Sequence, residues 1–333
     1  DGRRPAGEPT RTTAAELLGA ALYAGPDMSD VRGQGQALRA LEIAAAGSHN
    51  VLLVGPPGCG KTLMARRFPE ILPPLTEEEA LEATRVWSVA GMLQPDQALL
   101  VQRPFRAPHH HASAAAIIGG GSPLPRPGEI SLAHRGVLFL DELPLFSHTV
   151  LEALRQPLEE GTVRVVRQAT RVEYPASFCL VGAANPCLCS APSGTEGCIC
   201  PAGRLAAYRS RLSGPLLDRI DLQVEVPRLS QDELFDMEPS EPNAVIRGRV
   251  ARAREFRRSR EPTATQASGL GDLGPAQRRF LRLAAGGAAG SARGMDRLVA
   301  VARSIADLAL SHEIEEEHLA EALQYRRPVW GRS

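Results

Sequence analysis

The sequence predicts an α/β fold in which a parallel sheet is flanked by helices and followed by a small C-terminal helical lid. Two observations predict the sheet: one short apolar strand runs into a glycine-rich loop, and a second apolar strand ends in two adjacent acids. From about residue 243 onward, apolar residues recur at helical spacing instead. We therefore expect a linker over residues 1–27, a core domain over residues 28–232 and the helical lid over residues 233–333.

The composition is that of a globular protein whose charges cancel. The chain has 333 residues, 43% hydrophobic and 23% charged, and its 38 basic residues balance 38 acidic ones. Balanced charge produces no overall attraction to nucleic acid or anionic lipid, so such contacts would require local patches. The apolar runs are far shorter than the roughly 20 residues of a membrane helix, and we expect a cytoplasmic protein with no membrane partner. Because the chain starts at Asp1, with neither an initiator Met nor a signal peptide, we expect a fragment without its N-terminal part.

The first strand, residues 50–54, leads directly into a phosphate-binding loop. Residues 55–62 match the pattern GxxxxGK[ST], and a helix is predicted over residues 62–67. The glycines turn backbone amides toward phosphate oxygens, Lys61 reaches the β- and γ-phosphates, and the Thr62 hydroxyl binds Mg²⁺. Lys61 is the only lysine among the 38 basic residues, which indicates a position that requires a compact ammonium. The predicted ATP-binding residues are Gly55, Pro56, Pro57, Gly58, Cys59, Gly60, Lys61 and Thr62.

The second strand, residues 137–140, ends at Asp141 and Glu142. We expect Asp141 to hold the same Mg²⁺ as Thr62, and Glu142, one residue further out, to polarise the attacking water. Two adjacent acids favour a hydrolytic ATPase over a switch GTPase, which positions its water differently. The alternative is that these acids form an ordinary surface turn.

Two further strands carry candidate catalytic residues near their ends. Asn185 follows a strand over residues 177–183 and can orient the lytic water at the carboxyl ends of the strands. Arg219 precedes a strand over residues 222–226 and can reach the γ-phosphate of a neighbouring subunit as an arginine finger. The alternatives are a turn-forming Asn before Pro186 and an arbitrary member of the chain's 37 arginines.

A β-hairpin is predicted just before the third of these strands. Residues 162–167 and 171–174 alternate apolar and polar side chains around residues 168–170, after a helix predicted over residues 150–160. The hairpin residues Arg164, Arg167 and Arg171 can contact a phosphodiester backbone. Alternatively, they form a solvated strand edge whose charge prevents aggregation.

Two segments separate the predicted elements. About eighty residues lie between the phosphate loop and Asp141, more than one helix and one strand require, so we expect an insertion there. Residues 231–242 are acidic and contain prolines, which predicts a linker into the lid. The lid helices are predicted over residues 243–260, 275–285, 291–310 and 315–325.

Together these motifs resemble the ComM/YifB-type magnesium-chelatase-like AAA+ ATPases. The resemblance covers nearly the whole chain and includes residues 30–34, 49–62, 103–110, 127–134, 136–144 and 211–219. It implies a P-loop AAA+ module with a helix-two insertion and a pre-sensor hairpin. It also implies a hexameric ring of this chain with ATP and Mg²⁺ between subunits. In the family, the position of Arg293 is a second sensor that touches the γ-phosphate; the alternative is an arginine on the surface of a helix. Family members usually begin with a Lon-protease-like domain, which we expect this chain to lack.

The resemblance implies a function as well as a fold. The first hypothesis is an ATP-driven helicase or translocase that acts on single-stranded or branched DNA, with branch migration during natural transformation as its output. The second is a chelatase-type remodelling subunit that drives metal insertion by a partner. The third is a truncated chain that only binds nucleotide.

Four of the six cysteines form two pairs, Cys187 with Cys189 and Cys198 with Cys200. Disulfides are unusual in a cytosolic ATPase, whereas two thiolate pairs across a loop can hold a structural Zn²⁺, and many relatives look similar here. The alternative is a loop of reduced thiols. We expect the Cys59 side chain to be incidental in the phosphate loop and Cys179 to be a core residue. Three consecutive histidines, residues 109–111, are not expected to converge on one ion, and we expect a structural or intersubunit loop there.

Overall fold

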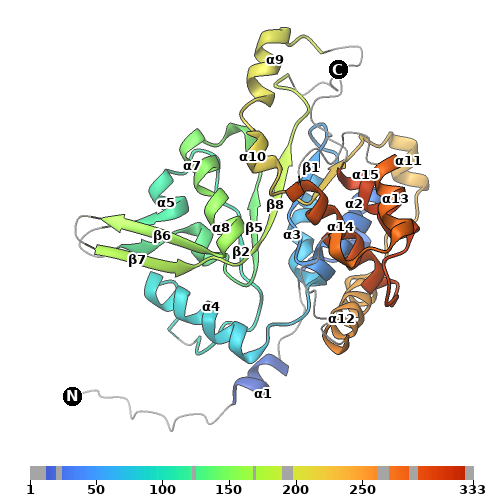
Figure 1. Ribbon diagram of the computed structural model, residues 1–333. Helices are drawn as coiled ribbons and strands as arrows, with labels where there is room; N and C mark the ends of the chain where they lie inside the picture. The colour runs from blue at the N-terminus through green and yellow to red at the C-terminus, as the bar shows by residue number, and fades with distance from the viewer. Residues whose placement is uncertain are drawn as a thin grey trace, which may run out of the picture.

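The computed structural model describes residues 13–19, 25–95, 97–121, 125–167, 170–189, 198–260, 270–284 and 292–326. These residues form a five-stranded parallel sheet in the order β2-β5-β8-β1-β9 (Figure 1). The strands are β1 (Val51–Val54), β2 (Phe105–Arg106), β5 (Val137–Leu140), β8 (Cys179–Ala184) and β9 (Leu222–Glu225). β1, β5 and β8 are buried throughout, as expected for parallel strands covered on both faces. The predicted α/β fold with a parallel sheet is confirmed.

The helical lid packs on one face of the sheet and shares its core. One hydrophobic cluster joins β1 and β9 to α2 (Gly35–Gly47), α3 (Lys61–Ile71), α12 (Asn243–Ser259) and α14 (Ala292–Leu308). α13 (Pro275–Ala284) and α15 (Glu316–Arg326) complete the lid beside α14. Arg254 of α12 donates to the Ala45 carbonyl of the core, and two ion pairs, Arg39 with Glu321 and Glu42 with Arg249, also join core and lid. Core and lid are therefore held together by apolar packing, by a hydrogen bond and by ion pairs.

The other face of the sheet is covered by the insertion and the hairpin. The expected insertion contains α4 (Glu77–Ala90), β2, α5 (Ala114–Ile118), β3 (Gly119–Gly120), β4 (Arg126–Pro127) and α6 (Glu129–Leu132). The predicted hairpin is β6 (Thr162–Arg167) paired with β7 (Thr170–Pro175), and it extends away from the sheet (Figure 1). Its tip, residues 168–169, lies outside the described residues. A second hydrophobic cluster joins the hairpin to strands β5 and β8 and to helices α5 and α6.

Three predictions from the sequence differ from the structure. The helix expected over residues 150–160 is two short helices, α7 (His148–Ala153) and α8 (Arg155–Glu160), because Pro157 has no N–H to donate to the Ala153 carbonyl. The linker expected over residues 231–242 contains α11 (Gln231–Asp236), which begins with a capping box of Ser230 and Glu233. The two-residue strand β2 was not predicted at all, because two residues carry no periodicity.

The remaining short elements complete the chain. They are α1 (Ala14–Gly19), α9 (Ala202–Arg209), α10 (Gly214–Leu217) and the 3-10 helices 28–30, 143–145 and 270–272. Most of the expected linker over residues 1–27, and Ser291 at the predicted start of the long lid helix, lie outside the described residues. In the part of the chain that is described, no helix combines the length and apolar character needed to cross a membrane.

A buried polar cluster joins the lid to the edge of the sheet where the strands begin. Arg297 of α14 donates to the Asp221 carboxylate at 2.6 Å and to the Arg219 carbonyl at 2.9 Å. Asp221 also accepts from the Asn50 amide at 2.9 Å. Burial would raise the pKa of Asp221, but hydrogen bonding from His49 and the charge of Arg297 bring it below its usual value. Asp221 is therefore a buried carboxylate that depends on its partners.

We predict that Arg297→Met lowers the free energy of unfolding by about 2–3 kcal/mol at pH 7, because it leaves the Asp221 charge buried with fewer partners. Urea unfolding measures this change. The control is Arg252→Met, which removes an exposed arginine from α12 and should leave the free energy of unfolding within about 0.5 kcal/mol of the parent. An equal loss in both variants would mean that the Asp221 cluster has no special role in stability.

Candidate active site

The phosphate-binding loop joins the end of β1 to the start of α3, where free backbone amides of a helix attract anions. Gly58 and Gly60 have φ angles of +77° and +97°, a left-handed conformation that glycine adopts readily. A side-chain carbon at Gly55 would lie 2.1 Å from the Val226 carbonyl oxygen, so only glycine fits there. The glycines of the motif are thus required by backbone geometry at three of the predicted ATP-binding positions.

Lys61 is held over this loop by uncharged acceptors. Its side chain is buried, and its Nζ donates to the carbonyls of Gly55 and Pro56 at 2.6 and 2.8 Å and to Asn185 Oδ1 at 3.2 Å. None of these three acceptors carries a charge that would neutralise the ammonium. Asn185, predicted from the end of the third strand, therefore lies beside the phosphate loop. Its carbonyl accepts from the Tyr208 hydroxyl at 3.1 Å, and burial raises the pKa of Tyr208 to about 12.

The predicted Mg²⁺ ligands lie next to each other. The Thr62 hydroxyl at the start of α3 donates to Asp141 Oδ2 at the end of β5, at 2.9 Å. The other Asp141 oxygen accepts from the Glu142 amide at 2.9 Å. A hydroxyl oxygen and a carboxylate oxygen beside a phosphate-binding loop are the donor types that Mg²⁺ prefers, so these residues fit the ion.

Glu142 has an unusual backbone and an unexpected partner. Its φ angle is +51°, a left-handed conformation that non-glycine residues adopt at a cost. Its Oε2 lies 3.1 Å from Nδ1 of His110, in the insertion. Burial, together with the charges of His109 and His111, lowers the pKa of His110. The sequence contained no signal for this pair, because its members are thirty-two positions apart and are brought together through β2.

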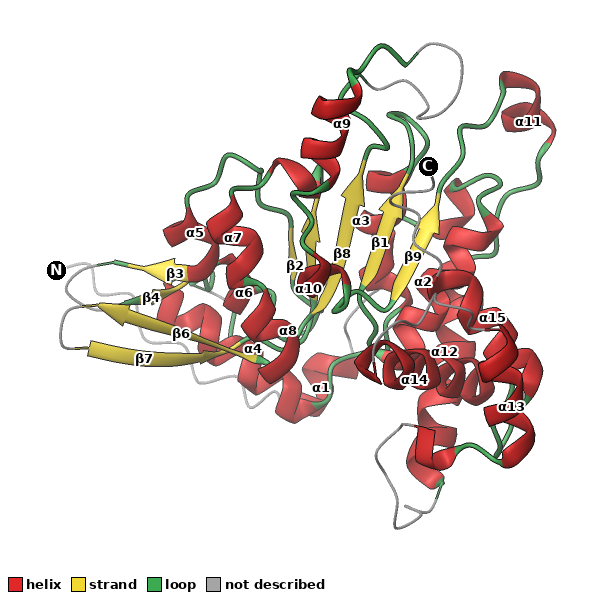
Figure 2. Ribbon diagram, turned by 45° about the horizontal axis from the view of Figure 1, so that its top comes forward, coloured by secondary structure: helices red, strands yellow, loops and turns green. Residues whose placement is uncertain are grey.

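Arg219 and Arg293 lie at the opposite edge of the sheet from the phosphate loop. The Arg219 carbonyl accepts from Asn50 Nδ2 at 3.0 Å, and Asn50 immediately precedes β1. A four-residue strand spans about 13 Å, so Arg219 is separated from its own loop by the length of β1. Arg293 Nη1 lies 3.4 Å from Glu159, whose same oxygen also contacts Arg219. In Figure 2, α10, which precedes Arg219, lies at the lower end of the sheet, whereas the arrowheads of β8, β1 and β9 point away from it. Neither arginine reaches the phosphate loop of its own chain.

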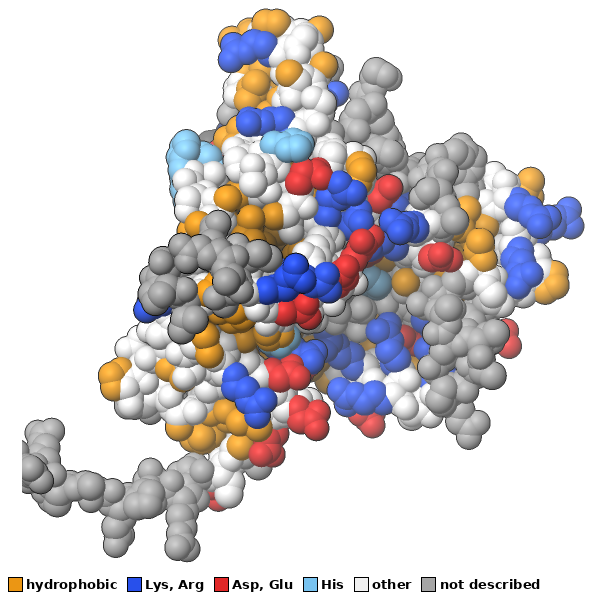
Figure 3. All heavy atoms as spheres, turned by 60° about the vertical axis from the view of Figure 1, so that its left-hand side comes forward, with side chains coloured by type: hydrophobic (Ala, Val, Ile, Leu, Met, Phe, Trp, Pro, Cys, Tyr) orange, Lys and Arg blue, Asp and Glu red, His pale blue; other side chains and the backbone are white. Residues whose placement is uncertain are grey.

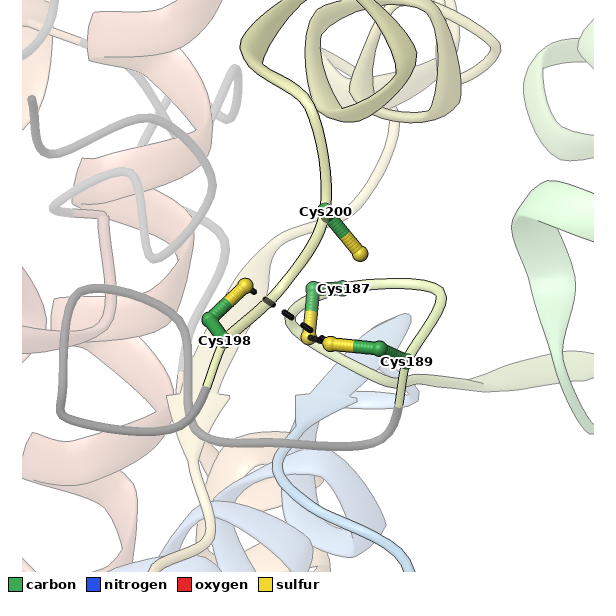
Figure 4. Close-up of side chains that lie close together, drawn as sticks. All are labelled: Cys187, Cys189, Cys198 and Cys200. Carbon is green, nitrogen blue, oxygen red and sulfur yellow. Dashed lines mark hydrogen bonds between the residues drawn. The ribbon is translucent and has the colours of Figure 1, made fainter.

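The four paired cysteines converge. One sulfur atom from each of Cys187, Cys189, Cys198 and Cys200 lies within 4.8 Å of the other three (Figure 4). Cys189 Sγ is 3.4 Å from Cys187 Sγ and 3.7 Å from Cys198 Sγ. Burial, followed by hydrogen bonds from the thiols of Cys189 and Cys198, raises the pKa of Cys187 to about 12. Residues 190–197, between the two pairs, lie outside the residues that the structure describes. Cys59 and Cys179 lie outside this cluster, and both are buried.

The three consecutive histidines also converge, contrary to expectation. One ring nitrogen from each of residues 109–111 lies within 4.8 Å of the others, because the chain turns at this point and stacks the rings of His109 and His111, with His110 tilted against both. The ring centroids of His109 and His110 are 4.2 Å apart. The expectation that consecutive histidines cannot approach one point was therefore wrong.

The hairpin arginines differ in their surroundings. Arg164 Nε donates to Glu173 directly across the hairpin at 2.7 Å, which partly neutralises it. Arg171 is exposed, and Arg167 lies in β6, with its side chain outside the described part. Figure 3 shows basic and acidic side chains intermingled on this side of the molecule. The coloured atoms of that view form no continuous basic patch.

Comparisons with known proteins agree with this architecture. The family model of magnesium chelatase subunit ChlI matches residues 27–234, and that of the ChlI C-terminal region matches residues 240–326. The chain is 44% identical to the uncharacterized protein YifB of Escherichia coli over 313 residues, and 44% identical to competence protein ComM of Haemophilus influenzae over 312. These alignments cover 90% and 91% of this chain and 60% of each relative.

A more distant similarity connects the chain to the chelatases themselves. It is 27% identical over 261 residues to the magnesium-chelatase 67 kDa subunit of Heliobacterium mobile, covering 68% of this chain and 37% of that protein. The chain spans about three fifths of the length of the ComM and YifB relatives. The two family models, and the identity to YifB and ComM along nine tenths of the chain, show that it belongs to the ComM/YifB-type group of the magnesium chelatase AAA+ family.

Proposed function

We propose that this chain hydrolyses ATP as a subunit of a ring of six copies, and that the ring acts on DNA. The proposal of a ring is supported by the separation of the candidate site into two halves. The phosphate loop, Asp141 and Glu142 lie at the carboxyl edge of the sheet, whereas Arg219 lies at the amino edge. One copy cannot complete the site, but copies arranged head to tail can, and head-to-tail contacts form a ring when the rotation between copies closes.

Each half of the site has a distinct role in this proposal. Lys61 and the loop amides bind the ATP phosphates, and Thr62 and Asp141 hold Mg²⁺, which would offset phosphate charge when bound. Glu142 accepts the proton of the attacking water, and Asn185 helps to orient that water. Arg219 and Arg293 of the neighbouring subunit approach the γ-phosphate, where charge develops during transfer.

Action on DNA is favoured over the other two hypotheses by two observations. The chain shares 44% identity with a protein named for competence, against 27% with magnesium-chelatase subunits. The hairpin also extends from the sheet with Arg171 exposed, which suits contact with a phosphodiester backbone. Remodelling of a chelatase-like partner is the second candidate, because both family models describe a magnesium-chelatase subunit.

We predict that Glu142→Gln still binds ATP but hydrolyses it at least about a hundredfold more slowly, because it loses the general base and keeps the Mg²⁺ ligands. Steady-state hydrolysis is measured without DNA, with single-stranded DNA and with forked duplex, at one salt concentration. The parent should be stimulated by DNA, and the variant should not respond.

Hydrolysis by Glu142→Gln at the parent rate would contradict the assignment of the base. Hydrolysis by the parent that is indifferent to both DNA substrates would favour the remodelling function instead. Binding of fluorescent ATP to both proteins separates a lost chemical step from a lost nucleotide site.

We also propose that the cysteine cluster holds a structural Zn²⁺. With Zn–S bonds of about 2.3 Å, tetrahedral geometry places neighbouring sulfurs about 3.8 Å apart, close to the 3.4 and 3.7 Å distances around Cys189. Four thiolates leave no open position for water, so the ion would have no catalytic role. The ion would cross-link the two cysteine pairs, which lie between β8 and α9, shortly after Asn185.

Metal analysis of the purified protein should find about one zinc per chain, since four thiolates form one complete site. Cys198→Ser/Cys200→Ser should lose it, because two ligands remain. Cys59→Ser, which changes a cysteine outside the cluster, should keep the metal. A parent protein that is folded and free of metal would contradict the proposed zinc site.

A further inference from the structure

Glu159 at the end of α8 brings together the two arginines of the proposed intersubunit site. Its Oε1 contacts Nη2 of Arg219 and lies 3.4 Å from Nη1 of Arg293. These three residues come from α8, from the loop before β9 and from α14. The hydrogen bond from Arg219, aided by the charges of Arg219, Arg293 and Arg297, lowers the pKa of Glu159, so the group is a carboxylate at neutral pH.

Arg219 is folded back onto its own subunit. Its side chain is only 8% exposed, whereas those of Glu159 and Arg293 are 39% and 77% exposed. Nη1 of Arg219 donates to the Pro215 carbonyl at 2.5 Å, one helical turn earlier. Its buried Nε has no hydrogen-bond partner among the described residues. The guanidinium therefore depends on one carboxylate and one carbonyl.

A γ-phosphate and a carboxylate are both oxygen anions that a guanidinium binds through the same N–H groups. Both Nη atoms of Arg219 already contact acceptors of its own subunit, Nη1 the Pro215 carbonyl and Nη2 Glu159, so a neighbouring γ-phosphate must compete with these acceptors for the same N–H groups. The ion pair thus competes with engagement of the neighbour's ATP. Arg219 can bind the neighbour's γ-phosphate only in molecules whose ion pair is open. Its apparent affinity for that phosphate therefore falls to the same fraction of the intrinsic value.

We propose that Glu159 is a positioning residue for ATP hydrolysis, which retains Arg219 and Arg293 on their own subunit until a neighbouring γ-phosphate replaces its carboxylate. This inference rests on the proposed function, in which the site is shared between subunits. It identifies what the two arginines contact before ATP arrives.

The position of Glu159 also connects this exchange to the hairpin. α8 ends at Glu160, and Gly161 turns the chain into β6 with a φ angle of +66°. The Gly161 carbonyl accepts from the Ala176 amide at 2.7 Å, which closes the base of the hairpin. Glu159 is therefore two residues from the point where the hairpin begins. A neighbouring nucleotide that releases the two arginines from Glu159 therefore changes a contact directly beside the base of the hairpin.

The test is Glu159→Gln, which keeps the shape of the side chain and removes its charge. Because Glu159 is 39% exposed, solvent screens its ion pairs, and we expect DNA-free ATP hydrolysis at subsaturating ATP to rise only about two- to fivefold. The rise should come from a lower KM for ATP with kcat close to that of the parent, because the carboxylate competes with the γ-phosphate for Arg219. A purely structural role for Glu159 would not lower KM at unchanged kcat.

Glu160→Gln is the matched control on the same helical turn. Glu160 accepts from Gln156 at 2.9 Å and lies 3.7 Å from Arg164, so it faces the hairpin instead of the arginine pair. Its hydrolysis rate should equal that of the parent. Thermal unfolding of both single variants checks that neither change disturbs folding.

Hydrolysis by Glu159→Gln at or below the parent rate would overturn the role of Glu159, and so would an equal rise in Glu160→Gln. These results are distinguishable from failure of the proposed function. If Glu142→Gln and Arg219→Ala each lose hydrolysis while Glu159→Gln matches the parent, the shared site stands and only the role of Glu159 is lost. If Arg219→Ala hydrolyses ATP normally, the shared site itself is wrong.

Discussion

Parallel strands bring all their carboxyl ends to one edge of a sheet and all their amino ends to the other, and the chemistry of this protein follows from that constraint. The phosphate loop, Asp141 and Asn185 follow the ends of β1, β5 and β8, and hydrogen bonds join them into one cluster. Arg219 precedes β9 and is held at the other edge by Asn50. The sheet that gathers the phosphate loop, Asp141 and Asn185 at one edge therefore keeps Arg219 at the other.

The lid reinforces this division. It packs against α2 on the face of β1 and β9, and Arg297 connects it to Asp221 and to the Arg219 carbonyl. Arg293, at the start of α14, is carried to the amino edge by the same packing. Arginine suits these positions, because a planar guanidinium can donate to several acceptors in different elements. The chain's single lysine lies instead at the phosphate loop, where one compact charge meets carbonyls and an amide oxygen.

Local patterns in the sequence were sufficient for the four longer strands of the sheet and for the residues at their carboxyl ends, because each of these residues directly follows an apolar strand. The contacts between His110 and Glu142, and among Glu159, Arg219 and Arg293, could not be predicted in this way, because they join segments far apart in the chain. Two errors had signals that were available. Pro157 marks the break between α7 and α8, and Ser230 with Glu233 is a helix start inside a segment that was interpreted as a linker.

The most direct test of the shared site is ATP hydrolysis by mixtures of Arg219→Ala and Glu142→Gln proteins. Each variant alone should be inactive, because one lacks the arginine that is offered to the neighbour and the other lacks the base. In a mixed ring, an interface between an intact base of one variant and an intact arginine of the other is complete. The account predicts that activity appears on mixing and depends on the ratio of the two proteins. No recovery at any ratio, in mixtures shown to form joint assemblies, would contradict a site shared between subunits.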